Sequence, residues 1–140
     1  MIRFFAETPF KIDDKQKLKQ WIKLVVSNEN KKIGDINFIF CDDEYLLAIN
    51  QQYLKHDYYT DVISFDNSFN NTISGEIYIS INTVKDNAQN RSIDFTAELR
   101  RVIIHGVLHF LGYKDKAKSE SKQMRAKEDY YLSLFRKEKY

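Results

Sequence analysis

The sequence has little of what marks a secreted or membrane protein. Its one cysteine, Cys41, excludes a disulfide within the chain and is typical of a reducing, cytosolic environment. Its longest apolar runs are four or five residues, far short of the roughly 20 that cross a bilayer. The N-terminus lacks the apolar segment of about 7–15 residues that a signal peptide requires. We therefore expect a cytoplasmic protein with no membrane partner.

Glycine, proline and net charge are also scarce. Four glycines and one proline leave few tight loops, and a length of 140 residues suits one domain, 1–140. The net charge of +2 is too small to indicate a nucleic-acid partner by itself. The second half of the chain nevertheless carries thirteen basic and nine acidic residues, whereas the first half carries nine and eleven.

Hydrophobic periodicity predicts an α+β fold in a single domain. Alternating or continuous apolar residues indicate strands near 4–5 and over 36–41, 61–65 and 75–81. Apolar stripes at helical spacing indicate helices from 13 to about 28, 42–53, 83–89, 94–111 and 119–137. We expect a small mixed sheet of about four strands packed with about five helices. The helix over 94–111 is apolar almost all round in its second half, so it should be central and buried.

This central helix carries two of the three histidines. His105 and His109 are four residues apart, so both rings leave the same face of the helix and can bind one metal ion. Two buried imidazoles in apolar surroundings each need a polar partner. That partner is either a metal ion or a backbone group, and the spacing alone leaves both interpretations open.

A metal site needs a third ligand, and the chain after the helix offers one. Gly112 is the natural left-handed end of the helix. Asp115 follows this turn, and it is the only carboxylate between Glu98 and Glu120. It either completes a His/His/Asp ligand set or is an exposed acid between two lysines.

The segment His105-Gly106-Val107-Leu108-His109-Phe110-Leu111-Gly112-Tyr113-Lys114-Asp115 resembles the H-G-x-L-H-x-x-G-Y-D-H signature of the YbeY family of bacterial endoribonucleases. Six positions match this signature. Lys114 stands where the family has Asp, and Asp115 stands where it has a third metal-binding His. The segments at 60–65 and 75–79 are similar to the family's T-D-V-L-S-F and G-D-I-x-I strands.

The resemblance implies a zinc-dependent endoribonuclease, specific for single-stranded RNA, that matures the 3′ end of small-subunit ribosomal RNA and serves ribosome quality control. It implies one Zn²⁺ per chain, held by His105, His109 and Asp115. An anionic third ligand lowers the net charge of the site by one and weakens its Lewis acidity. Leu54 occupies the position of the family's active-site Arg, so Lys55 or His56 is the candidate substitute.

The residue after the first histidine narrows the chemistry. Metalloproteases with an H-E-x-x-H helix use the Glu as a general base, whereas Gly106 cannot accept a proton. Hydrolysis of a phosphodiester through a metal-activated water remains open. Tyr58 and Tyr59 are candidates for stacking on unpaired bases. A cationic rim for RNA is predicted from the basic residues that follow the helix, Lys114, Lys116, Lys118, Lys122, Arg125 and Lys127.

Two other functions fit the residues as well. One is a metal-stabilised module that binds RNA or the ribosome without cutting RNA. The other is a zinc hydrolase that acts on a substrate other than RNA.

Overall fold

The structure is a computed structural model that describes residues 1–54 and 61–137. Two candidate site residues, Lys55 and His56, lie outside the described residues, as do Tyr58 and Tyr59. The metal-ligand candidates all lie within them.

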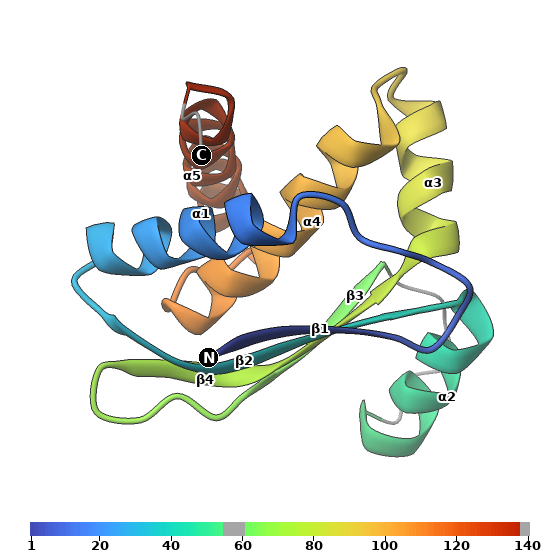
Figure 1. The fold of residues 1–140 in the computed structure, drawn as a ribbon, viewed down its shortest axis with the longest axis horizontal. Helices are drawn as coiled ribbons and strands as arrows, with labels where there is room; N and C mark the ends of the chain where they lie inside the picture. The colour runs from blue at the N-terminus through green and yellow to red at the C-terminus, as the bar shows by residue number, and fades with distance from the viewer. Residues whose placement is uncertain (55–60, 138–140) are drawn as a thin grey trace.

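A four-stranded mixed sheet forms one layer of the fold (Figure 1). Its order is β1-β2-β4-β3, with β1, β2 and β4 parallel and β3 antiparallel to β4. The strands are β1 (Ile2–Ala6), β2 (Lys32–Cys41), β3 (Val62–Asp66) and β4 (Thr72–Ser80). Most of the apolar side chains of β2 and β4 are buried, as parallel central strands require.

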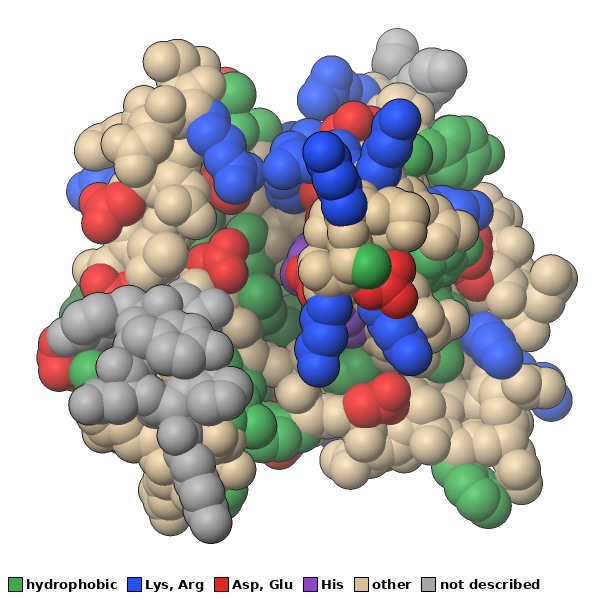
Figure 2. Space-filling model, turned by 180° about the vertical axis from the view of Figure 1, so that it is seen from behind, with side chains coloured by type: hydrophobic (Ala, Val, Ile, Leu, Met, Phe, Trp, Pro, Cys, Tyr) green, Lys and Arg blue, Asp and Glu red, His purple; other side chains and the backbone are tan. Residues whose placement is uncertain are grey.

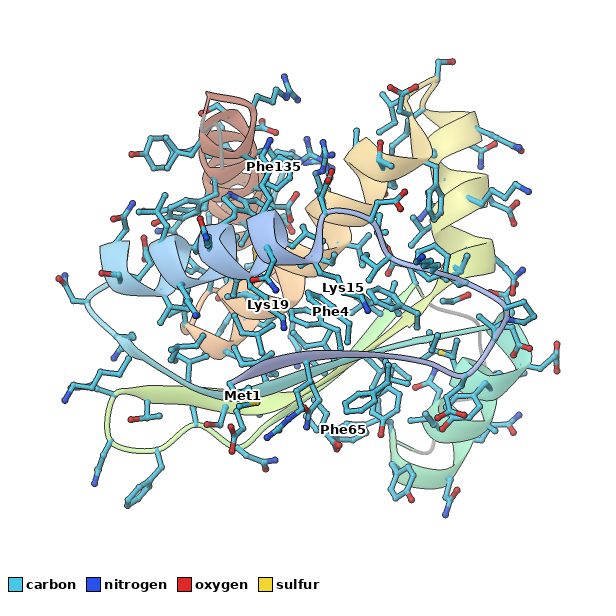
Figure 3. The ribbon with its side chains drawn as sticks, in the orientation of Figure 1. Met1, Phe4, Lys15, Lys19, Phe65 and Phe135 are labelled. Carbon is cyan, nitrogen blue, oxygen red and sulfur yellow. The ribbon has the colours of Figure 1, made fainter. Side chains whose placement is uncertain are left out.

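Within residues 1–54 and 61–137, five helices accompany the sheet, which confirms the predicted α+β class. They are α1 (Lys15–Asn28), α2 (Asp43–Leu54), α3 (Ile81–Asn90), α4 (Phe95–Phe110) and α5 (Lys118–Lys137). Helices α1, α4 and α5 lie over one face of the sheet, and α2 lies on the other side near one end (Figure 1). Accordingly, Phe4 points from the sheet toward the helices, whereas Phe65 projects from the opposite face (Figure 3).

Several local expectations differ from the structure. Strands β2 and β4 begin at Lys32 and Thr72, earlier than the apolar pattern suggested, because these two polar residues pair with each other in the ladder. In α2, the aromatic Tyr45 is 39% exposed, while the polar Asn50 is buried, so the buried face does not follow hydrophobicity alone. Asp14 precedes α1 in a left-handed conformation without a side-chain capping hydrogen bond.

The central helix α4 is buried as predicted and lies close to the sheet. Val107 and Leu108 are fully buried, and Gly112 adopts a φ of 101° just after the helix end. A Cβ atom at Gly106 would lie 2.9 Å from Cδ1 of Ile77 on β4, so glycine allows this close approach. The approach brings the histidine-bearing end of α4 against the sheet.

Glu29 links the end of α1 to the segment that follows α4. Its carboxylate accepts hydrogen bonds from the hydroxyl of Tyr113 at 2.5 Å and from the hydroxyl of Tyr131, and it pairs with Lys127 Nζ at 3.3 Å. Burial acts to raise the pKa of Glu29, but these three donors outweigh it and lower the pKa. Burial and the contact with Glu29 raise the pKa of both tyrosines, so their hydroxyls stay protonated as donors.

Replacing Glu29 by Gln should lower the free energy of unfolding by about 1–3 kcal/mol at neutral pH, because the buried hydroxyl of Tyr131 and the half-buried hydroxyl of Tyr113 lose a charged acceptor. The carboxylate's contribution is complete above the ordinary glutamate pKa of 4.5 and is lost as the pH falls through the lowered folded-state pKa. Urea unfolding at pH values from 7 down to 3 should therefore show the stability of the wild type converging on that of Glu29→Gln. Glu7→Gln, at an exposed position, is the control and should behave like the wild type throughout.

Candidate metal centre

His105 and His109 face one another on the last turns of α4. Their Nε2 atoms are 3.0 Å apart, and their side chains are 21% and 30% exposed. The rings therefore lie at the edge of the helix layer and not in a dry interior. This placement disagrees with the interpretation of two core histidines that are satisfied only by backbone groups.

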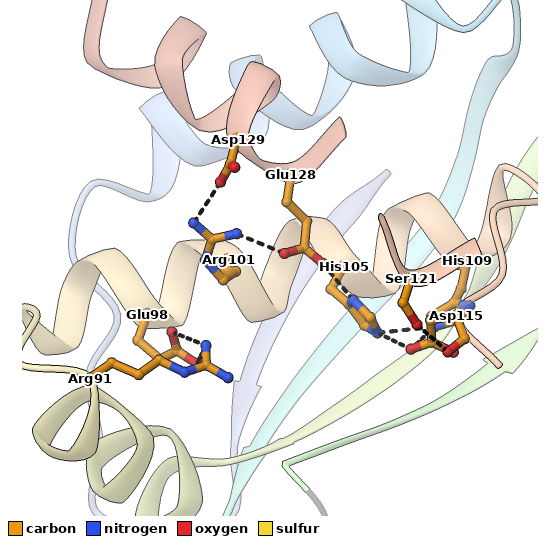
Figure 4. Close-up of polar contacts among 9 residues, drawn as sticks. All are labelled: Arg91, Glu98, Arg101, His105, His109, Asp115, Ser121, Glu128 and Asp129. Atoms are coloured by element: carbon orange, nitrogen blue, oxygen red, sulfur yellow. Dashed lines mark hydrogen bonds and ion pairs between the residues drawn. The ribbon is translucent and has the colours of Figure 1, made fainter. Parts of the chain in front are cut away.

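Asp115 reaches the same point from the segment after α4 (Figure 4). Its Oδ2 lies 3.2 Å from Nε2 of His105 and 3.6 Å from Nε2 of His109. The hydroxyl of Ser121 donates a 2.7 Å hydrogen bond to the backbone carbonyl of Asp115, which ties this segment to the first turn of α5. The chain thus doubles back so that the carboxylate faces both rings.

The three candidate ligand atoms are spaced as a tetrahedral metal site requires. Bonds of about 2.0–2.1 Å place the ligand atoms of a tetrahedral zinc about 3.3–3.4 Å apart. The observed separations of 3.0, 3.2 and 3.6 Å bracket that distance. His105, His109 and Asp115 could therefore hold one metal ion and leave its fourth position open.

The two imidazoles differ in their electrostatic surroundings. Burial lowers the pKa of His109, and the neighbouring His105 acts in the same direction. Burial acts to lower the pKa of His105 as well. The hydrogen bond and charge of Glu128, together with the charge of Asp115, outweigh this effect and raise the pKa of His105. Since a metal ion binds the neutral imidazole, protons compete for the site mainly at His105.

Sequence reasoning missed the polar residues that surround the site. A cavity of about 240 Å³ beside His105 is lined largely by charged side chains that pair across it. Glu98 accepts a hydrogen bond from Arg91 at 3.0 Å, and Glu128 accepts one from Arg101 at 2.8 Å. Glu98, Arg101 and His105 recur at helical spacing along one face of α4, and this spacing was the sequence signal for them.

Asp61 also lines this cavity, at the chain segment that leads into β3. Burial raises the pKa of the Asp61 carboxyl, while the charges of His105 and Arg91 act against that shift. Asp61 therefore places a half-buried carboxyl, whose charged form is disfavoured by its surroundings, in the cavity that His105 and Asp115 also line.

The basic side chains after α4 lie mostly in solvent. Lys114, Lys116, Lys118, Lys122 and Arg125 are exposed, whereas Lys127 is occupied by its ion pair with Glu29. Figure 2 shows Lys and Arg side chains gathered around the hollow in which the histidines are visible. An anionic ligand would therefore meet positive charge before it reached the histidines. Among the described residues, no helix is both long and apolar enough to cross a membrane.

Comparison with known proteins gives consistent matches over nearly the whole chain. The family model of Endoribonuclease YbeY matches residues 4–136. Proteins named Endoribonuclease YbeY from Christiangramia forsetii and Karelsulcia muelleri are 52% and 51% identical, covering 96% and 100% of this chain and 94% and 99% of their own lengths. A solution structure from Thermotoga maritima superposes with a TM-score of 0.68 at 28% identity, over 96% of this chain and 89% of the other.

Proposed function

The chain belongs to the YbeY family of endoribonucleases, and on that premise we propose that residues 1–140 form one zinc-dependent enzyme that cuts single-stranded RNA. Its proposed role is to mature the 3′ end of small-subunit ribosomal RNA, and to serve ribosome quality control, in association with the ribosome in the cytoplasm.

The observation that carries this proposal is the convergence of His105, His109 and Asp115 at the open end of α4. Their three ligand atoms lie within 4.8 Å of one another. A divalent ion in such a site supplies Lewis acidity toward a phosphodiester and makes water a stronger acid. The proposal assigns one zinc ion to these three residues. It leaves Lys55 and His56 as candidates for contact with the substrate.

The chain's own residues supply binding and proton transfer. Asp61 places a carboxyl in the cavity that His105 and Asp115 also line, where it can accept a proton and return it during hydrolysis. Gly106 offers no such group, and this argues against a peptidase.

Among the described residues that line the cavity, Arg125 is the basic side chain without a carboxylate partner. It lies in the lining together with Asp115. Arg91 and Arg101, in contrast, are held by carboxylates. Arg125 is therefore suited to contact a phosphate of the RNA next to the one that is cut.

Cleavage of RNA by the purified chain tests the proposal. We expect it to cut a single-stranded oligonucleotide and to leave the same sequence intact in a duplex. A chelator should abolish cutting, and added zinc should restore it, because the ligands remain in place. Fragments are resolved on a denaturing gel.

The two alternatives give different results in the same assay. RNA that is bound with salt-sensitive affinity but never cut would point to a binding module. Cutting of a peptide or ester, with RNA intact, would point to another hydrolase. Either result would contradict the proposed enzyme.

A further inference from the structure

Glu128 contacts the candidate ligand His105 from a different helix. It projects from α5, is 4% exposed, and uses its two carboxylate oxygens separately (Figure 4). Oε2 lies 2.7 Å from Nδ1 of His105, and Oε1 accepts a 2.8 Å hydrogen bond from Nη1 of Arg101. One partner on each oxygen gives this buried carboxylate a single orientation.

The contact determines which nitrogen of His105 carries the proton. The guanidinium of Arg101 can only donate, and its positive charge lies 2.8 Å from Oε1, so Glu128 faces both partners as a carboxylate that can only accept. The proton of a neutral His105 ring therefore sits on Nδ1. This leaves a lone pair on Nε2, the atom that faces His109 and Asp115 at 3.0 and 3.2 Å.

We propose that Glu128 is the positioning residue of the metal centre: it fixes the tautomer and ring orientation of His105, and Arg101 fixes Glu128 in turn. The inference rests on the proposed zinc site and adds that metal binding depends on how α5 packs against α4. Partners that orient a ligating histidine typically contribute about 10–100-fold to metal affinity.

Asp129 supplies a matched control. It is the neighbour of Glu128 on α5 and accepts a 2.8 Å hydrogen bond from Nη2 of the same Arg101. Its side chain is 59% exposed, and its described contacts do not include His105. Asp129→Asn therefore removes a carboxylate charge next to Arg101 without changing any contact of His105.

Zinc affinity of the full chain, measured by competition with a chromophoric chelator, tests the proposal without RNA. We expect Glu128→Gln to weaken zinc binding by about 10–100-fold and Asp129→Asn to change it by less than about threefold. Circular dichroism of the metal-free proteins shows whether both variants fold. Equal zinc affinity in Glu128→Gln and the wild type would overturn the proposal.

A second readout needs no variant. Nitrogen-15 spectra of the metal-free wild type, at a pH where His105 is neutral, should show this ring protonated on Nδ1. An Nε2-protonated ring would overturn the role of Glu128, whether or not Glu128→Gln folds. If the zinc affinities are as expected but the wild type does not cut RNA, only the proposed function is contradicted. A wild type that binds no zinc would overturn both.

Discussion

Replacing His109 by Ala should remove both metal and activity from a chain that still folds. We expect zinc content to fall from about one ion per chain to near zero, and RNA cleavage to fall by at least about 10³-fold, because two remaining ligands hold zinc poorly. The His109 side chain is 30% exposed, so its loss leaves no large void in the core. Metal analysis and cleavage of a single-stranded RNA measure the two effects.

Two comparisons sharpen this experiment. Thr96→Ala changes an exposed residue at the other end of α4 and should leave metal content and cleavage unchanged. Asp115→Ala should weaken zinc binding, whereas Asp115→His restores a neutral third ligand and should retain the ion. Full metal content and activity in His109→Ala would show that the ion is held elsewhere in the chain.

Replacing Gly75 by Ala should have the largest effect on stability. Gly75 adopts a φ of 156°, and a Cβ there would lie 2.3 Å from the backbone carbonyl oxygen of Phe65 and 2.6 Å from Cζ of Phe110. Backbone strain and the clash together should cost about 3 kcal/mol or more. Thermal unfolding should show a midpoint about 10 °C below that of the wild type.

Gly112→Ala separates the two contributions to this loss. Gly112 also has a positive φ, 101°, but no atom lies within 4 Å of the position of its Cβ. Gly112→Ala should therefore lower the free energy of unfolding only by the backbone strain of an alanine at positive φ, about 1–2 kcal/mol. Equal losses in the two variants would mean that the contact with Phe65 relaxes at little cost.

The sequence predicted most of the architecture because the core follows simple periodicities. The stripe of Leu18, Trp21, Ile22 and Val25 is buried in α1, as its spacing required. The predicted helix over 94–111 corresponds to the central helix α4, and its apolar second half is buried. A mixed sheet of four strands lies beneath it. These features depend on local patterns, and a single sequence contains them in full.

The site was predicted less completely, for a physical reason. His105, His109 and Asp115 were candidates because they lie near one another along the chain. Glu128 and Arg101 could not be assigned a role, since their contact depends on how α5 crosses α4. Charged residues at such crossings resemble an ordinary solvated helix face until the packing is known.

The closeness of the candidate ligands along the chain also bears on what an ion in the proposed zinc site would do for the stability of the fold. The candidate ligands lie within 11 residues of one another, over 105–115. In the unfolded chain, bringing them together around an ion closes only a short loop and costs little entropy, so the same donors remain available to the ion after unfolding. A ligand that binds both states stabilises the native one only by the difference in affinity. With the proposed zinc site, the native state would then owe its stability mainly to apolar packing, including the contact of Trp21 with Phe135, and the chain would fold without the ion but lack the proposed activity.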